Sequence, residues 1–97
     1  MTTLDKLVKF RFHGKQIPEY MYPGIINYVD HGILPGHFLR GILFKDLVSC
    51  IDRADSENLW LIPLYYAFFY NEIPGNIWGN QINVVEHIRN THEAIEQ

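Results

Sequence analysis

Hydrophobic and polar residues alternate near the N-terminus of the chain. In the segment KLVKFRFH, residues 6–13, three apolar side chains fall on one side of an extended backbone and basic ones fall on the other. Gly14 then ends the alternation. The pattern predicts a short strand or extended arm over residues 1–16. Since the rest of the chain offers no partner strand, three arrangements stay open: a small hairpin, a segment lying across helices, or pairing with a second copy.

From Ile17 onward, apolar residues recur every three or four positions, which is typical of helices. Pro18 suits the first position of one helix, and Gly32 suits its C-terminal cap. A second helix is expected to follow the Leu34-Pro35-Gly36 step and to run to about Asp52. Its apolar residues continue without a visible break.

Asp55 or Ser56 is predicted to cap a third helix that runs to Asn71. Pro63 lies within this helix and should either kink it or mark its true start. A loop rich in Pro and Gly follows, and Asn80 can then cap a last helix. The narrow apolar stripe of this last helix consists of Ile82, Val85 and Ile88.

These elements predict a mainly α protein with one domain, residues 1–97. Residues 17–95 should form a compact bundle of about four helices, and residues 1–16 the strand or extended arm.

Composition narrows the class of protein. The 97 residues are 47% hydrophobic and carry a net charge of −3, without the basic stripe of a nucleic-acid binder. The longest apolar run, residues 59–70, is too short for a membrane span of about 20 residues, and no signal peptide precedes it. The single cysteine excludes an intrachain disulfide and fits a reducing cytosol. We therefore expect a cytoplasmic protein that binds neither membranes nor nucleic acid.

Arg40 is the charge that fits its predicted helix least well. On a helical projection it shares a stripe with Leu43, Phe44, Leu47 and Ile51 and lies near the helix N-terminus, the unfavourable end for a cation. Such a charge needs a carboxylate, several carbonyls or a bound anion. One interpretation is a packed stem with a solvated or ion-paired head.

The second interpretation of Arg40 is a helix-start pocket. Gly36, His37 and Arg40 would then hold a phosphate or carboxylate. Both interpretations stay open at this point.

Residues suited to catalysis or metal binding are scattered. The histidines at positions 13, 31, 37, 87 and 92 form no HExxH pattern and have no cysteine cluster beside them. Cys50 lies in mid-helix, where nothing would activate it, so we expect a quiet core thiol. No phosphate loop, nucleophile elbow or dinucleotide fingerprint occurs. We predict that the chain is not an enzyme and uses no metal or cofactor.

The third helix is apolar on every side, so it must be central in the fold or covered by something else. Its aromatic residues and the loop tryptophan are of the type enriched at interfaces. Core packing and an interface with a partner or a second copy both stay open. The candidate interface residues are Trp60, Tyr65, Tyr66 and Trp78.

The stretch from Ile17 to Asn80 also carries an ordered set of short motifs. They read IP, Y, HGI, PG, FL, DL, RAD, EN, YNE, P and WG in chain order. This set resembles a family of small proteins encoded by bacteriophages and other mobile elements, for which we know of no established activity. The chain departs from the family in Pro63 and in its N-terminal arm. The resemblance implies a genomic setting and no mechanism.

The motif corners suggest where a site would lie. Antiparallel helices would bring the Pro-Gly corner and the Trp-Gly loop to one end of the bundle. A ligand or partner site there would be lined by His31, His37, Arg40, Asn71 and Trp78. The alternative is that these residues only cap helices and fix loops.

The sequence therefore favours a small phage or mobile-element accessory protein that acts by stoichiometric binding. Its partner would be a host or phage protein, such as a host defence or regulatory factor that it inhibits. Two other hypotheses stay open: a protein that sequesters an anionic nucleotide through Arg40, and a component of virion assembly.

Overall fold

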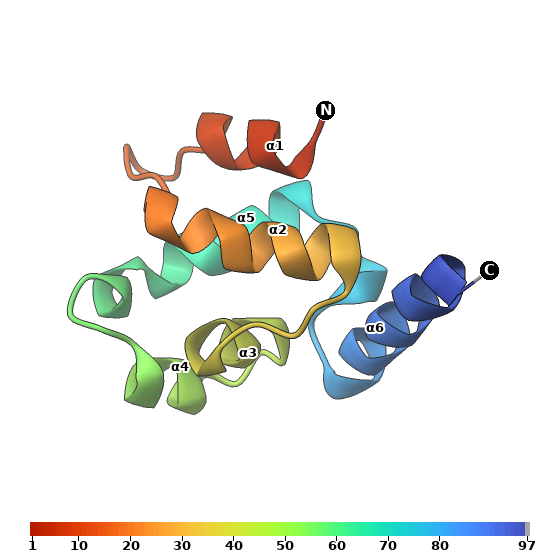
Figure 1. The fold of residues 1–97 in the computed structure, drawn as a ribbon. Coiled ribbons are helices and arrows are strands. Elements are labelled where there is room, and N and C mark those ends of the chain that lie inside the picture. The colour runs from red at the N-terminus through yellow and green to blue at the C-terminus, as the bar shows by residue number, and fades with distance from the viewer. Residues whose placement is uncertain (97) are drawn as a thin grey trace.

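Helices account for nearly all regular structure in residues 1–96, the part of the chain that the computed structural model describes (Figure 1). The side chains of residues 1–93 are described with it. The mainly α prediction is confirmed. The elements are α1 Thr3–Lys9, η1 Glu19–Met21, α2 Tyr22–His31, α3 His37–Leu43, α4 Leu47–Arg53, η2 Asn58–Leu61, α5 Ile62–Glu72, η3 Gly75–Ile77 and α6 Gln81–Glu96, where η marks a 3₁₀ turn.

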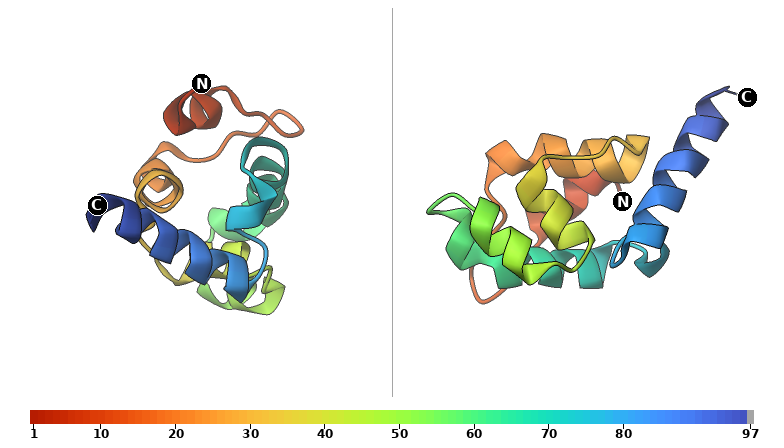
Figure 2. Two further views of the ribbon diagram at one scale, coloured as in Figure 1. Left: turned by 90° about the vertical axis from the view of Figure 1, so that its right-hand side faces the viewer. Right: turned by 90° about the horizontal axis from the view of Figure 1, so that it is seen from below.

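Helices α2 and α5 form the middle of the fold. Helix α1 covers one side of this pair, the α3–α4 hairpin covers the other, and α6 lies across one end (Figures 1 and 2). The prediction of about four helices is therefore wrong in number, since six α-helices are present in residues 1–96. None of these helices is both long enough and apolar enough to cross a bilayer.

The predicted N-terminal strand is wrong, because residues 3–9 form helix α1. Thr2 and Asp5 make a reciprocal capping box: each side chain accepts a hydrogen bond from the other residue's backbone N–H. Leu7 and Phe10 are three residues apart and face the core, while Val8 is half exposed. The alternating pattern gave a wrong prediction because Leu7 and Phe10 also fit the three-residue spacing of a helix.

Three contacts hold α1 on the helices below it. The Thr3 hydroxyl donates to Asp30 Oδ1 at 2.7 Å, and Lys6 Nζ donates to the Glu72 carbonyl at 3.0 Å. A lysine at the carbonyl end of α5 is favoured by the helix dipole. Phe10 meets Phe68 edge to face with centroids 5.4 Å apart. The N-terminal segment is thus an integral layer of the fold.

A tight turn reverses the chain after α1. Phe12 and Lys15 exchange two backbone hydrogen bonds of 2.9 and 3.0 Å across His13 and Gly14. Both central residues have positive φ, at 51° and 76°, as a two-residue hairpin turn requires. This single bridge is all that forms of the small hairpin considered above.

The prediction of one long second helix is also wrong, because this segment forms two helices, α3 and α4. Lys45 adopts a left-handed conformation with φ 56°, and the Asp46 side chain then caps α4 by accepting from the Ser49 N–H at 3.2 Å. The Asp46 N–H closes the end of α3 on the Gly41 carbonyl at 2.8 Å. The chain reverses here, so the apolar stripe projected from Arg40 does not continue into α4.

The two short helices pack closely where a glycine faces a cysteine. A Cβ added at Gly41 would lie 2.8 Å from Cys50 Sγ and 3.0 Å from the Cys50 nitrogen. A larger residue at position 41 would therefore push α4 away from α3. Cys50 is fully buried, as expected of a core thiol.

Helix α5 is the central helix. Pro63 lies in its first turn and therefore marks the start of the helix instead of kinking it, which was one of the two predicted outcomes. Tyr65 and Phe68 are fully buried. Tyr65 meets Phe38 of α3 edge to face, and Phe68 meets Phe10 on the other side. The apolar sequence of this helix is explained by its neighbours on opposite sides.

Helix α6 docks through a stripe that matches the predicted one only in part, because Ile88 packs against the core as predicted. Ile82 and Val85 are exposed, whereas Val84 is buried. His87 Nε2 donates to the Tyr28 carbonyl at 2.9 Å and lies 3.1 Å from the Val29 carbonyl. Asn80 caps the helix as predicted, because its Oδ1 accepts from the Asn83 N–H at 2.8 Å.

Candidate functional site

The structure separates the five residues that were predicted to line one site. His37 and Arg40 line a cavity between α3 and α4. Asn71 and Trp78 line a groove of about 340 Å³ beside α5 and the α3–α4 turn. His31 lines neither and lies exposed at the end of α2. The predicted single site at one end of the bundle is therefore divided into two pairs and one separate residue.

The Arg40 guanidinium is half-buried beside the start of its own helix. Its Nε donates to the Pro35 carbonyl at 2.7 Å. No carboxylate lies within ion-pairing distance of Arg40 among the described side chains. One carbonyl therefore compensates part of the charge, and the two terminal nitrogens are left for other acceptors.

Trp78 is buried, so its ring serves packing first. It lies 5.5 Å from the Phe69 ring, and Lys45 Nζ lies 5.1 Å from the Trp78 ring centroid as a cation–π contact. The Gly79 N–H donates to the Leu43 carbonyl at 2.6 Å and fixes the loop to α3. The Asn71 amide turns back to the Ala67 carbonyl at 2.8 Å. The Asn71 amide and the Lys45 ammonium group of this groove thus already have contacts within the chain.

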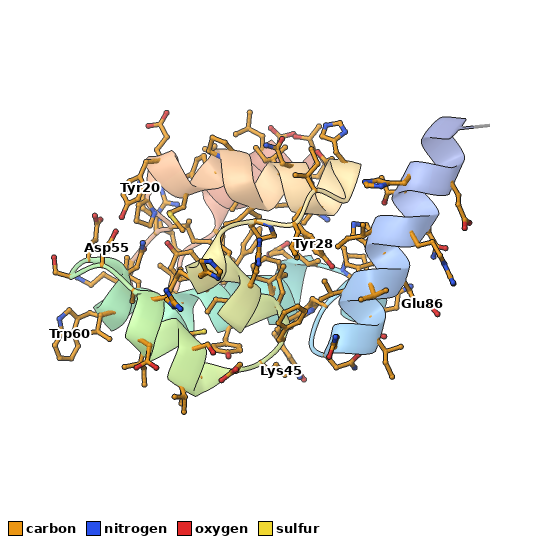
Figure 3. The ribbon with its side chains drawn as sticks, turned by 60° about the horizontal axis from the view of Figure 1, so that its bottom comes forward. Tyr20, Tyr28, Lys45, Asp55, Trp60 and Glu86 are labelled. Carbon is orange, nitrogen blue, oxygen red and sulfur yellow. The ribbon has the colours of Figure 1, made fainter. Side chains whose placement is uncertain are left out.

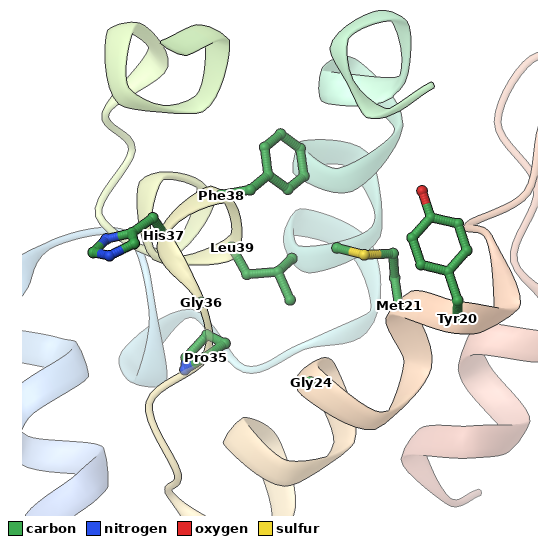
Figure 4. Close-up of a pocket in the computed structure, with 8 residues that line it drawn as sticks. All are labelled: Tyr20, Met21, Gly24, Pro35, Gly36, His37, Phe38 and Leu39. Carbon is green, nitrogen blue, oxygen red and sulfur yellow. The ribbon is translucent and has the colours of Figure 1, made fainter. Parts of the chain in front are cut away.

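A third hollow, of about 300 Å³, lies between η1 and the start of α3 (Figure 4). Met21 and Leu39 point toward one another across it, while the His37 ring points away. Gly24 permits the approach, because an added Cβ would lie 3.1 Å from Leu39 Cδ1. Its lining carries no Asp, Glu, Lys or Arg side chain, so it suits packing better than ionic recognition.

The four predicted interface residues differ sharply in exposure. Tyr65 is fully buried and Trp78 is 4% exposed, so neither offers surface to a partner. Tyr66 is half-buried, and its hydroxyl lies 4.0 Å from Cys50 Sγ. Trp60 is 81% exposed and projects away from the ribbon (Figure 3). Among these residues, Trp60 has the surface that an interface needs.

Helix α4 carries further exposed apolar side chains, which sequence reasoning missed. Leu47, Val48 and Ile51 are exposed by 52, 68 and 49%, and they share one side of the helix. Cys50 is the buried residue of α4. The 3₁₀ turn that carries Trp60 lies beside α4 (Figure 2). We call Leu47, Val48, Ile51 and Trp60 the α4 face.

Acidic residues are frequent in the segment of chain that carries the α4 face. Residues 46–60 contain Asp46, Asp52, Asp55 and Glu57, against Arg53 as the one cation. These four carboxylates are exposed. A partner would therefore meet an apolar centre with a negative rim.

A hydrogen-bond network at the Arg-Ala-Asp corner holds the turn that carries Trp60. Asp55 Oδ1 accepts from the Asn58 N–H at 2.7 Å and so fixes the start of η2. The buried Asn58 accepts from the Tyr65 hydroxyl and donates to the Tyr20 hydroxyl at 3.2 Å. Trp60 thus extends from a turn whose other end is anchored in the core.

The titratable groups near the core are held in their neutral forms. Burial raises the pKa of Cys50 and of Tyr28, Tyr65 and Tyr66 above their ordinary values. A protonated, buried Cys50 is a poor nucleophile. Within residues 1–96, no three His, Cys, Asp or Glu residues come together in a way that would hold a metal ion.

Scans of this chain against protein-family models, curated proteins and solved structures each returned no match.

Proposed function

We propose that this chain is a small accessory protein that acts by binding one partner protein in a fixed ratio through the α4 face. The exposure of Leu47, Val48 and Ile51 on α4, together with that of Trp60 on the turn that follows, is the observation that carries the proposal. Burying one such apolar side chain is worth about 1.5–3 kcal/mol. Tryptophan is also one of the residue types enriched in binding hot spots.

The acidic rim supports a different protein as the occupant, in preference to a second copy. In a symmetric dimer the same face would meet itself, so Asp52, Asp55 and Glu57 would approach their own copies. Like charges at a rim disfavour association. The partner that fits has an apolar groove bordered by lysines or arginines.

The resemblance to mobile-element proteins supports a bacterial host cell as the setting. The partner would then be a cytoplasmic host defence or regulatory protein that is blocked by occupation of its surface. The neutral, buried thiol and tyrosines described above support contact in preference to catalysis.

The test is affinity purification from bacterial host cells, followed by reconstitution and light scattering of the complex. Val48→Asp places a charge on the α4 face without disturbing the core, because Val48 is 68% exposed. Val85→Asp is the matched control, since Val85 is an exposed apolar residue on α6. We expect one protein to bind the wild type and Val85→Asp stoichiometrically, and binding to fall at least about tenfold in Val48→Asp.

Two results would overturn the proposal. One is a partner that binds Val48→Asp as tightly as the wild type. The other is a dimer of this chain alone that Val48→Asp dissociates, because a second copy would then occupy the face.

A further inference from the structure

Two arginines from different helices line one polar cavity, which has a volume of about 280 Å³. Arg40 reaches it from α3 and Arg53 from the last turn of α4. The reversal of the chain at Lys45 brings these two positions together. The remaining lining residues are His37, Gly41, Phe44, Asp46 and Ser49.

Neither arginine is neutralised by an ion pair within the described side chains. The pairs that arginine forms there belong to Arg89, with Glu86 at 3.5 Å and Glu93 at 3.9 Å. Arg40 uses its Nε on the Pro35 carbonyl, which leaves the terminal nitrogens of its guanidinium group. Two guanidinium groups with donors to spare thus line the cavity, where Arg40 is half-buried and Arg53 is exposed.

Asp46 is the one carboxylate of the cavity, and it already has partners. It accepts from the Ser49 N–H at 3.2 Å and from the Ser49 hydroxyl at 2.8 Å. These hydrogen bonds lower its pKa, so it stays ionised as the cap of α4. Two cations against one carboxylate leave the cavity positive in a chain whose net charge is −3.

The number of hydrogen-bond donors on the two arginines favours a phosphate over a carboxylate as the bound anion. One guanidinium fork satisfies both oxygens of a carboxylate, whereas a second guanidinium from another helix needs further acceptor oxygens. A tetrahedral phosphate group has them. The half-buried Phe44 ring adds an apolar wall, and the cavity is larger than a phosphate group alone needs. Both features suit a phosphate attached to an organic body.

We infer that the cavity between α3 and α4 binds a phosphate monoester, with Arg40 and Arg53 holding the phosphate and Phe44 covering the organic part. Ser49 and Arg53 lie four residues apart on the side of α4 opposite to Leu47 and Ile51. The inference is therefore independent of the partner proposed for the α4 face.

The test is calorimetric titration of the full chain with AMP, inorganic phosphate and adenosine at one ionic strength. We expect AMP to bind, inorganic phosphate to bind more weakly, and adenosine to bind at least tenfold more weakly than AMP. Arg53→Gln should weaken AMP binding about tenfold. Arg89→Gln, which removes an arginine of α6, should leave it unchanged.

Arg40→Lys completes the set, because Arg40 also supports Pro35 and a larger change there could disturb the fold. Lysine keeps the charge but lacks the planar fork, so AMP binding should again weaken about tenfold. The inference fails if adenosine binds as well as AMP, or if no probe binds at millimolar concentration. It also fails if Arg89→Gln weakens binding as much as Arg53→Gln, since general charge attraction would then explain the result.

Discussion

The Tyr20 hydroxyl lies 3.1 Å from Asp55 Oδ2, across 35 positions of sequence. Figure 3 labels both residues, and the Asn58 side-chain amide donates to each of them. This contact joins η1, which precedes α2, to the turn that precedes α5. It therefore fixes the entry points of the two middle helices relative to each other. Asn58 is 3% exposed and completes the network by accepting from the Tyr65 hydroxyl.

Replacing Asn58 should be costly, because it would leave the buried Tyr65 hydroxyl without an acceptor. We expect Asn58→Leu to lower the free energy of unfolding by about 2–3 kcal/mol, measured by urea denaturation. Tyr20→Phe is the control, because Tyr20 is 56% exposed and water can replace its hydroxyl. It should cost less than about 1 kcal/mol. Equal losses in both variants would mean that Asn58 is not the centre of the network.

Lowering the pH should destabilise the fold, because it protonates Asp55 and Asp46. Hydrogen bonding from the Asn58 N–H lowers the pKa of Asp55 below its ordinary value of 3.8, and Ser49 does the same for Asp46. A folded-state pKa below the unfolded one gives stability that is present above the unfolded pKa and lost as pH falls through the folded pKa. Unfolding free energy should therefore decline as pH falls below about 4.

The matched variants for the acid effect are Asp55→Asn and Asp52→Asn. Asparagine at position 55 can still accept a hydrogen bond from the Asn58 N–H but does not titrate, so the stability should fall less steeply between about pH 5 and 2. Asp52 is exposed and lies in the same acidic segment, so Asp52→Asn controls for the loss of one negative charge. Identical slopes in the wild type and Asp55→Asn would contradict the prediction. Denaturant titrations at several pH values measure these slopes.

The close approach of α3 and α4 predicts a strong effect of one added methyl group. Gly41→Ala would place a Cβ 2.8 Å from Cys50 Sγ, so we expect a loss of about 1–3 kcal/mol in thermal or denaturant unfolding. Gly75→Ala is the control, because nothing lies within 4 Å of a Cβ there. If Gly41→Ala were as stable as Gly75→Ala, the helices could not be packed as described.

Local signals in the sequence were sufficient for helix ends that side chains or a glycine determine. Gly32 ends α2 with φ 64°, and Asp55 and Asn80 accept backbone hydrogen bonds at the predicted starts. Each of these interactions spans only a few residues. They could therefore be predicted without knowing the fold.

Other features depended on tertiary packing. The left-handed residue that separates α3 from α4 is Lys45, a residue type that gives no turn signal. The position of Arg53 beside Arg40 follows from that reversal, so the cavity between them could not be predicted. Sequence reasoning did identify Arg40 as a charge in need of a partner. The exposure of one side of α4 likewise depends on how the helices pack together in three dimensions. No local sequence pattern encodes that arrangement.

The two tryptophans provide a spectroscopic check on the α4 face. Trp60 is 81% exposed and Trp78 is 4% exposed. Trp78→Phe should leave red-shifted emission that acrylamide quenches readily, and Trp60→Phe should leave blue-shifted emission that resists quenching. Because a bound partner would cover Trp60, its addition should shift and protect the emission of Trp78→Phe while changing Trp60→Phe little. A shift in the Trp78 emission of Trp60→Phe instead would place the partner on the groove beside α5, and Trp60 emission that stays readily quenched after the partner is added would exclude the α4 face from the interface.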